Sequence, residues 1–519
     1  MALIKGGMLD RRGFLKTTAA TAVAATLPMG GAAIAAPKRG GHIRVGKGHG
    51  QTTDTLNPGT WENGFTIDMA FAIHGYLVEV GPDGSMVPNL AESWEASSDA
   101  SEWRFKLRKG VTFHSGKELT VEDCIASINF HRGEGSTSAA GPIVAPIVDM
   151  TADGDDTIVF TLDGGNADFP AILTDYHIPM LKVDGDSVDW ASGDGCGAYK
   201  LKSIDFGVQA SFERNPNHWR EDVGFFDTIE MISLIDLNAR TTALVSGDVD
   251  VIDRLDLKTV GLLARNAGVN VKSVSGNAHY TIPMDTRKAP FNDNNVRQAL
   301  KYGINREELV EKILFGYGSV GNDHPIGRGQ LYFNTELEQK TYDPDKAKFF
   351  LKEAGMDSLA IDLSSSDAAF GGAVDAAILY QASAKSGGIE LNVIREPNDG
   401  YWSDVWMKKG MVFSYWAGRP VEDQMFATAY KCGASWNESY WCNEKFDSLM
   451  LQARAELDTD KRREMYWEMQ AMCANEGGAV IPMFNDYVFA INDKVVTPET
   501  MATNFDLDGS RWAERWSLA

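Results

Sequence analysis

Residues 103–123 read WRFKLRKGVTFHSGKELTVED, a stretch that combines two local signals. Trp103, Phe105 and Leu107 alternate with charged residues, which predicts a half-buried β-strand. The segment 120–123 then has the Thr-x-x-Asp pattern of a helix capping box. We therefore expect a strand, a turn and a helix whose core face carries Cys124, Ile125 and Ile128, so Cys124 is a packing residue.

The same two periodicities recur along most of the chain. Ile158, Phe160 and Leu162 repeat the strand alternation, while Asn305 and Asp343 are the expected N-caps of further helices. Helical spacing is found at 296–304, 305–314, 344–354 and 465–473, and strand-like segments at 228–235, 270–274 and 389–394. This alternation predicts an α/β fold. Because 519 residues exceed one core and no long linker divides them, we expect several lobes with a cleft between them.

The N-terminus has the pattern of an export signal. Residues 10–16 read DRRGFLK, an Ala-rich run follows, and residues 33–35 read AIA. Paired arginines, a short apolar run and a small-residue cleavage site in this order predict a twin-arginine signal peptide over residues 1–35 rather than a cytoplasmic amphipathic helix. The mature chain then begins near Ala36. The first cysteine is Cys124, so no lipid anchor is expected and a free, soluble periplasmic protein follows.

The composition excludes several partners. The net charge of the chain is -23, and an acidic surface disfavours both nucleic acid and anionic lipid. No later stretch approaches 18 uninterrupted apolar residues, which a membrane span needs.

No constellation typical of an enzyme occurs in the sequence. The nine histidines never pair at metal-ligand spacing, and no Cys-x-x-Cys or His-Glu-x-x-His motif is present. The Gly-rich segment 193–197 lacks the Lys-Ser or Lys-Thr of a phosphate loop, and Cys196 within it has no obvious histidine partner. We therefore expect neither catalysis nor a resident cofactor or metal.

The cysteines predict one disulfide. Cys432 and Cys442 are ten residues apart in a loop rich in Gly, Ser and Asn, and the periplasm is oxidising. We expect them to pair. Cys124, Cys196 and Cys473 remain, and the odd count leaves at least one thiol free.

Several blocks, taken together, carry a resemblance. They are PNLAESW at 88–94, FKLRKGVTFHSG at 105–116, LTVED at 119–123, ERNPNHW at 213–219, SGDVD at 246–250, PFND at 290–293 with RQAL at 297–300, and YDPDKA at 342–347. In this order they resemble the peptide-type periplasmic solute-binding proteins of ABC importers, solute-binding family 5. That family also covers dipeptide, oligopeptide, opine and nickel-chelate binders.

The resemblance implies a three-lobed α/β binding protein of type II that is not an enzyme. Lobe I is expected to comprise residues 36–80, 190–285 and 485–519, the extra β-rich lobe II residues 81–189, and lobe III residues 286–484. Such a receptor is mostly monomeric, closes around a small solute and delivers it to an ABC permease in the inner membrane.

The resemblance also implies a solute site near residues 415–420, which read YWAGRP. In dipeptide and oligopeptide binders, a similar segment carries a Trp, here Trp416, and then an Asp that holds the α-amine of the ligand. Arg419 occupies that Asp position. The inverted charge favours a carboxylate or sulfonate over an amine. An equally open interpretation is that Arg419 forms a surface salt bridge to Glu422 or Asp423.

A second departure lies at residues 284–287, MDTR, where the family usually has Asn before the Thr. If Asp285 and Arg419 both face the cleft, the site suits a zwitterion such as an amino acid, a betaine or an opine-like conjugate. Alternatively, Asp285 caps a turn or pairs with Arg287. Further aromatic contacts are expected from Tyr280, Trp402, Trp406 and Tyr199.

Three other functions stay open on the sequence alone. A metal-chelate or haem carrier of the same fold needs His or carboxylate groups in its cleft. A secreted enzyme that receives its cofactor before twin-arginine export is suggested by the signal peptide alone. A sensor that presents its loaded form to a membrane receptor shares the same fold.

Overall fold

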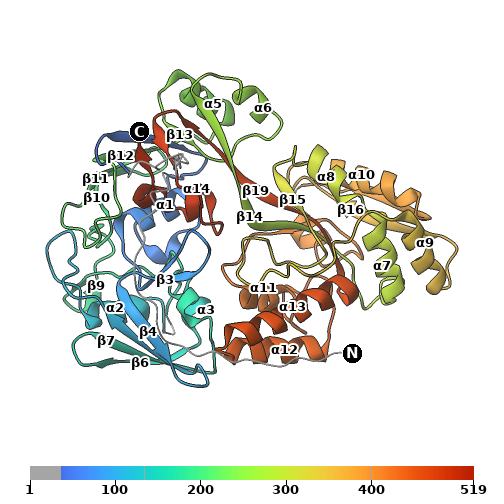
Figure 1. Cartoon of the computed structure of the whole chain (residues 1–519), viewed down its shortest axis with the longest axis horizontal. Helices are drawn as coiled ribbons and strands as arrows, with labels where there is room; N and C mark the ends of the chain where they lie inside the picture. The colour runs from blue at the N-terminus through green and yellow to red at the C-terminus, as the bar shows by residue number, and fades with distance from the viewer. Residues whose placement is uncertain (1–36, 134, 399) are drawn as a thin grey trace, which may run out of the picture. The chain divides into compact units, whose positions relative to one another are not determined.

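Two long antiparallel strands, β14 (Val269–Pro283) and β19 (Ala479–Asn492), pair along most of their length. All of residues 284–478, called the insert below, lie between these two strands in the chain. The chain therefore enters the insert from β14 and leaves it into β19, and Figure 1 shows these two strands running between the insert and the rest of the fold. A register break between Ser275 and His279 interrupts the pairing. Gly276 lies there because a Cβ would come within 2.8 Å of the Asn485 carbonyl oxygen.

The computed structural model describes residues 37–133, 135–398 and 400–519. The signal peptide expected at residues 1–35 and the mature start at Ala36 lie outside the described residues. Residues from Pro37 to Ala519 form one unit.

Strands β14 and β19, called the hinge strands below because the chain enters and leaves the insert through them, belong to a nine-stranded mixed sheet. Its order is β10-β11-β12-β1-β13-β19-β14-β18, and β15 also pairs with β19. The other strands are β1 (His42–Lys47), β10 (Tyr199–Asp205), β11 (Gln209–Arg214), β12 (Thr228–Ser233), β13 (Val251–Ile252), β15 (Gly318–Val320) and β18 (Ser414–Trp416). Strand β18 is an edge of this sheet, which leaves one side of its backbone without a strand partner.

Residues 91–162 contain a separate four-stranded antiparallel sheet of order β4-β5-β7-β6. Its strands are β4 (Ala91–Ala96), β5 (Glu102–Leu107), β6 (Ile147–Asp153) and β7 (Thr157–Leu162). The two alternating segments of the sequence are β5 and β7. Helix α2 (Val121–Asn129) begins at the predicted capping box, in which Thr120 and Asp123 bond reciprocally. Cys124 and Ile128 are wholly buried, so the packing role predicted for Cys124 is confirmed.

The remaining small sheets are two-stranded. Four pairs occur in the described part of the chain: β2 (Val78–Val80) with β3 (Met86–Pro88), β8 (Val183–Asp184) with β9 (Ser187–Val188), parallel β16 (Leu359–Ser365) with β17 (Ile389–Arg395), and β20 (Val495–Val496) with β21 (Ser517–Leu518).

Besides α2, the helices outside the insert are α1 (Gly64–Ile73), α3 (Gly141–Val144), α4 (Phe169–Ile172), α5 (Leu237–Ser246), α6 (Val260–Leu263), α14 (Asp506–Gly509) and α15 (Trp512–Arg515). Short turns of 3-10 and π-helix are found at Pro58–Thr60 and Tyr401–Val405. The α-helices of the insert are α7 (Asn294–Gly303), α8 (Arg306–Lys312), α9 (Pro344–Glu353), α10 (Ala373–Lys385), α11 (Glu422–Ala429), α12 (Glu444–Ala455) and α13 (Thr459–Glu476).

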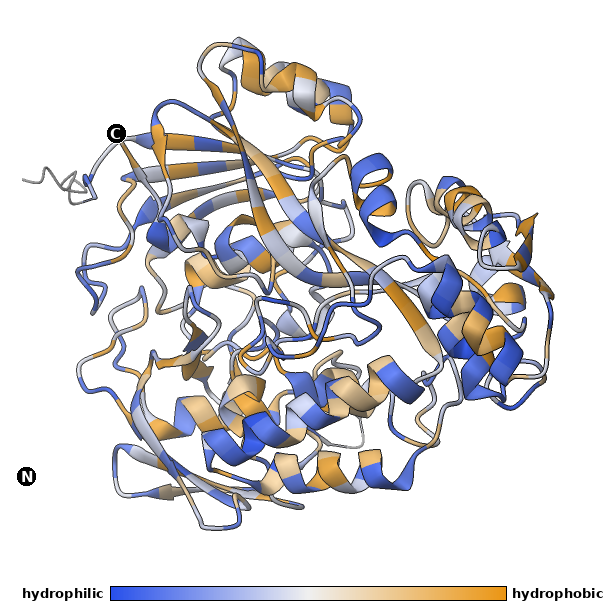
Figure 2. Cartoon of the chain, turned by 45° about the vertical axis from the view of Figure 1, so that its right-hand side comes forward, coloured by the Kyte–Doolittle hydropathy of each residue, from blue (hydrophilic) through white to orange (hydrophobic). Residues whose placement is uncertain are grey.

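The predicted helix signals of the insert are confirmed. Asn305 and Asp343 cap α8 and α9 through their side chains. Helix α8 ends at Lys312, two residues before the end of the predicted helical segment 305–314. Along α13, Met469 and Cys473 are buried, as the methionine spacing predicts. Figure 2 shows hydrophilic and hydrophobic residues mixed along these helices, as expected where one side faces solvent.

The insert has two hydrophobic cores. One collects α7, α9 and α10 with β16 and β17, and the other collects α11, α12 and α13. Separate cores surround the four-stranded sheet and the strands that include β1 and β12. The α/β class is thus confirmed, whereas the exact lobe boundaries stay a prediction. Edge strand β18 contributes Trp416 to the helical core of the insert.

Candidate functional site

The edge strand β18 and the turn after it form the candidate site. Trp416 pairs with His279 of β14, and Tyr415 pairs with Tyr280. Side chains alternate along a strand, so Trp416 and Tyr415 point to opposite faces of the sheet edge. Arg419 follows in the turn that leads to α11.

Arg419 is half-buried and its guanidinium lies 5.7 Å from the centre of the Trp416 ring. It donates to the carbonyl oxygens of Ala417 and Gly418 at 3.1 and 3.3 Å. Among the described residues, no carboxylate lies within ion-pair distance of Arg419. Burial lowers the pKa of this guanidinium, which marks it as a cation held partly away from water.

The surface salt bridge that we considered for Arg419 is not formed. Glu422 is buried and accepts from the Tyr332 backbone N–H at 2.8 Å. Asp423 pairs with Arg454 at 2.9 Å. Both neighbouring carboxylates are therefore used elsewhere, and the Arg419 charge is left for another partner.

Trp416 is 6% exposed, and its indole N–H donates to Glu438 at 2.9 Å. Trp436 lies beside it, with ring centres 5.9 Å apart, and is itself half exposed. The expected aromatic Trp416 is thus flanked by a second tryptophan and covered by a cation.

Glu438 was missed by the sequence analysis. Its buried carboxylate also accepts from the Trp406 indole N–H and from the Ser414 hydroxyl. Burial raises its pKa, while the three donors act in the opposite direction. The one signal in the sequence that could have indicated Glu438 is its position between Cys432 and Cys442, because a loop closed by a disulfide brings its residues close to other segments.

Trp402, Trp406 and Tyr280 lie on the Tyr415 side of the strand or next to it. Trp402 is 40% exposed and meets Trp406 and Tyr415 edge to face, at 5.8 and 5.7 Å. Tyr280 stacks on Phe370 at 3.7 Å and packs against the α/β core of the insert. This burial raises the pKa of Tyr280 to about 12.

Tyr199 does not belong with these aromatics. It is wholly buried in the core around β1 and β12, and its hydroxyl accepts from the Phe226 backbone N–H at 3.0 Å. The expectation of a solute contact is wrong because the strand β10 turns this side chain inward.

Asp285 is buried, and its two oxygens meet nearby cations. Arg287 and Lys288 lie 2.9 and 3.0 Å away, and hydrogen bonds from Arg287 and Lys288 hold the pKa of Asp285 at about 2. Arg287 in turn lies over the Tyr440 ring. The alternative in which Asp285 pairs with Arg287 is therefore the arrangement that the structure contains.

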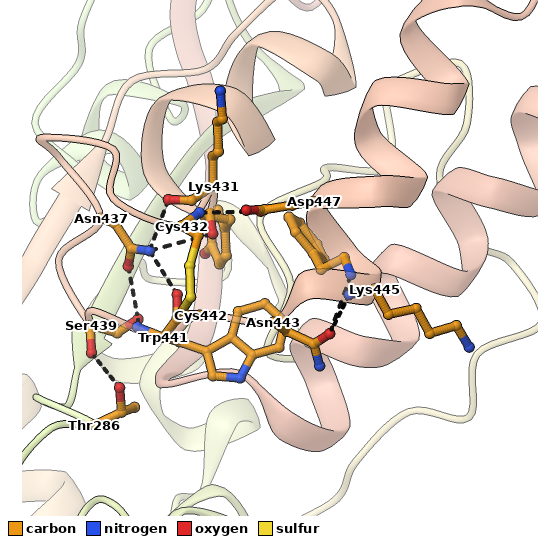
Figure 3. The surroundings of a disulfide bond; sticks show 12 residues. Thr286, Lys431, Cys432, Asn437, Ser439, Trp441, Cys442, Asn443, Lys445 and Asp447 are labelled. Carbon is orange, nitrogen blue, oxygen red and sulfur yellow. Dashed lines mark hydrogen bonds between the residues drawn. A yellow bond between two sulfur atoms is a disulfide. The ribbon is translucent and has the colours of Figure 1, made fainter.

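The predicted disulfide joins Cys432 and Cys442, whose Cα atoms are 4.7 Å apart (Figure 3). The Asn437 amide braces the loop by donating to the carbonyl oxygens of Tyr430, Lys431 and Trp441. Ser439 accepts from Thr286 through its carbonyl oxygen. Cys124, Cys196 and Cys473 are buried free thiols in the part of the chain described here.

A cavity of about 300 Å³ lies beside strands β15 and β19. It is lined by residues 319–339 and by Phe484, whose ring is 5.1 Å from His279. His324, on its wall, is 1% exposed, and burial lowers its pKa to about 3. The imidazole is therefore neutral at physiological pH, and the described residues contain no cluster of three His, Cys, Asp or Glu side chains that could hold a metal.

Comparison with known families identifies the family of the chain. The sequence profile of bacterial extracellular solute-binding proteins, family 5 Middle, matches residues 85–438. The chain is a family 5 extracellular solute-binding protein. A twin-arginine translocation signal matches residues 8–28, which confirms the predicted leader and export to the periplasm. No helix among the described residues is both long and apolar enough to cross a bilayer.

Relatives of this family 5 protein bind different solutes. It is 26% identical to the dipeptide-binding protein of Escherichia coli, over 82% of this chain and 86% of that protein. It is 27% identical to the nickel-binding periplasmic protein of the same organism, over 56% of this chain and 58% of that protein. It is 26% identical to heme-binding protein A of Haemophilus influenzae, over 54% of this chain and 56% of that protein. The family consists of binding proteins and not of enzymes.

Solved structures confirm the fold of this family 5 protein. The unliganded open form of the murein tripeptide-binding protein MppA superposes with a TM-score of 0.82 at 19% identity, covering 93% of this chain and 97% of that one. AgaA from A. tumefacien R10, in complex with agropinic acid, superposes with a TM-score of 0.70 at 21% identity, covering 92% and 99%. The shared fold spans nearly the whole described chain.

Proposed function

We propose that this protein captures a peptide-like or zwitterionic amino-acid-derived solute with a free carboxylate and delivers it to an ABC permease in the inner membrane. The observation that carries the proposal is Arg419. Its guanidinium is half-buried over Trp416 and has no carboxylate partner among the described residues. Family membership supplies the transport step.

A guanidinium in this setting suits a carboxylate. Its planar fork donates two parallel hydrogen bonds to the two oxygens, and such charge-assisted bonds are about twice as strong as neutral ones. Partial burial increases the advantage because fewer water molecules compete. Sulfonates are suited by the same geometry, whereas a free amine would be repelled.

The edge of β18 supports a ligand with an amide backbone. Ser414, Tyr415 and Trp416 pair with β14 on one side, and their other side ends the sheet. An extended peptide can bond to such an edge as an added strand. The exposed rings of Trp402, Tyr415 and Trp436 provide flat surfaces for its side chains.

Asp285 remains the proposed partner of a ligand amine. Its carboxylate is occupied by Arg287, which donates to both oxygens at 2.9 Å, and by Lys288 at 3.0 Å, so a ligand amine has to displace these cations. The proposal therefore rests on the binding of the solute's carboxylate by Arg419. The Asp285→Asn variant tests separately whether Asp285 binds the amine of the solute.

A metal-chelate carrier is the second candidate, favoured by the nickel-binding relative. Arg419 would then hold carboxylates of the chelator rather than of a peptide. A nickel–histidine complex belongs in the same binding screen, and the metal content of the purified protein separates the two candidates.

The test is a thermal-shift screen of the mature protein against amino acids, betaines, opines, di- and tripeptides, and nickel chelates. Binding to the native state raises its melting temperature by mass action. We expect a shift with a carboxylated peptide-like or zwitterionic compound, reduced about a hundredfold in affinity by Arg419→Ala and less by Arg419→Lys. Arg463→Ala, which removes a surface arginine of α13 paired with Asp460, is the control.

Two results would overturn the proposal. One is a shift with no compound of the panel. The other is binding of a carboxylated compound with the same affinity in Arg419→Ala as in the native chain.

A further inference from the structure

The loop between Cys432 and Cys442 carries two residues that contact the candidate site. Trp436 lies beside the Trp416 ring, and Glu438 reaches beneath it. Neither belongs to the segment around Arg419 in the sequence. The disulfide closes this loop at its base, as Figure 3 shows.

In the described part of the chain, the side-chain donors to the Glu438 carboxylate are all neutral. It is 8% exposed and accepts from the indole N–H groups of Trp416 and Trp406 and from the Ser414 hydroxyl. No lysine, arginine or histidine of the described chain lies within ion-pair distance of it. A buried carboxylate without a cation is costly unless its oxygens are well satisfied.

The chemistry of these partners explains why a carboxylate is present. An indole N–H is a donor only, and an ionised carboxylate is an acceptor only. Two indoles and a hydroxyl can therefore all donate to one carboxylate. A glutamine amide would turn one of its own N–H groups toward an indole N–H, so at least one donor would lose its partner.

Both tryptophans lie at the edge strand where we place the solute. Trp416 carries the Arg419 guanidinium over its ring. Trp406 meets Trp402, which in turn meets Tyr415. One carboxylate thus connects the ring on one face of β18 with the aromatic group on the other face.

We propose that Glu438 is a positioning residue of the solute site, and that the Cys432–Cys442 disulfide fixes the loop from which Glu438 orients Trp416 and Trp406 before solute arrives. The solute-binding consequence rests on the proposed function, because it requires Trp416 and Arg419 to face the solute. The orientation itself does not, and it is measurable in the free protein.

Hydrogen bonds from Asn437 also hold the loop, and they limit how much the loop loosens when the disulfide is broken. Asn437 is 2% exposed and its amide donates to three carbonyl oxygens of the loop. Breaking the disulfide therefore loosens the loop without releasing it. We expect the paired Cys432→Ser and Cys442→Ser changes to act in the same direction as Glu438→Gln but more weakly.

The first experiment uses the free protein labelled with ¹⁵N-tryptophan. Trp406→Phe and Trp416→Phe assign two of the thirteen indole N–H signals. We expect both to lie downfield and to exchange slowly in the native chain, as carboxylate-bound groups do, and at least one to move upfield and exchange faster in Glu438→Gln. Glu396→Gln is the control, because that carboxylate also accepts a serine hydroxyl, from Ser364. Unchanged indole signals in a folded Glu438→Gln protein would disprove the positioning role.

The second experiment measures affinity for an equimolar pool of L-alanyl dipeptides. We expect Glu438→Gln to weaken binding about tenfold in the native background and less than twofold in Arg419→Ala, since positioning acts through the same contact. Equal losses in both backgrounds would show a general structural effect and overturn the inference. If Arg419→Ala binds the pool normally, the proposed function fails, and the indole signals alone decide the role of Glu438.

Discussion

Arg419 and Asp285 have opposite charges, but their surroundings differ in one respect that decides what each is free to do. Asp285 has Arg287 and Lys288 close to it in the chain, and both reach its carboxylate. Arg419 has Glu422 and Asp423 three and four residues after it, yet both are turned away into other bonds. Sequence proximity thus predicts the partner of one residue and fails for the other, because α11 begins at Glu422 and directs its first side chains inward.

Glu422 also makes stability depend on pH. Burial raises its pKa from 4.5 to about 7, so the native chain holds this proton over a range in which the unfolded chain has lost it. The stability from this group is fully present below pH 4.5 and is lost as pH rises through 7. The change is up to about 3 kcal/mol, given 1.36 kcal/mol per pKa shift of one.

We therefore expect Glu422→Gln to remove this part of the pH dependence. We expect the difference in free energy of unfolding, native chain minus variant, to decrease as the pH is raised from 4.5 to 7.5. Urea denaturation at four pH values measures this difference. Glu464→Gln, at an exposed position of α13, should give a curve parallel to the native one. Parallel curves for Glu422→Gln as well would refute the assignment.

Helices α2, α8 and α9 begin where their sequences predict, because each start depends on contacts within four residues. Thr120, Asn305 and Asp343 accept hydrogen bonds from backbone N–H groups of the first turn. The hinge strand β14 illustrates the opposite case. Only residues 270–274 had a recognisable strand pattern, whereas the strand continues to Pro283 through pairing with β19.

The capping of α9 provides a stability test. Asp343 accepts from the backbone N–H groups of Asp345 and Lys346, and its replacement by alanine leaves both without this partner. We expect Asp343→Ala to lower the free energy of unfolding by about 1 kcal/mol, measured by urea denaturation. Asp345→Ala, in the same turn with its side chain 93% exposed, should cost clearly less. An equal cost for the two variants would contradict the capping role.

The insert is joined to the rest of the fold by two strands, yet it makes a further polar contact far from them in the chain. Asp168, just before α4, pairs with Arg462 of α13 at 2.6 Å, and both side chains are largely buried. Next to it, the Ala167 N–H donates to the Arg454 carbonyl oxygen. Because two paired strands resist bending weakly, these contacts restrain the separation of the two parts.

Breaking the ion pair should loosen that restraint. In Asp168→Asn, we expect the distance between labels at positions 149 and 464 to increase or broaden, since a buried Arg462 loses its counter-ion. Spin labels on Asp149→Cys and Glu464→Cys, both exposed positions, report it by pulsed electron resonance. Asp460→Asn removes a surface ion pair within α13 and should leave the distance unchanged. The same distance in Asp168→Asn would show that other contacts hold the parts together.

The amino-acid sequence by itself determined the export signal, the α/β class, the family, the capped helices and the Cys432–Cys442 pair. Each of these depends on residues close together in the chain or on blocks in a recognisable order. Only the tertiary structure decided that Arg419 has no carboxylate partner among the described residues, that Tyr199 is buried in a core, and that Glu438 holds Trp406 and Trp416. These facts depend on side chains from distant segments, which meet at β18 for Arg419 and Glu438 and in the core around β1 and β12 for Tyr199. Hydrogen-bond partners from distant segments follow from direction and distance, which no local pattern encodes.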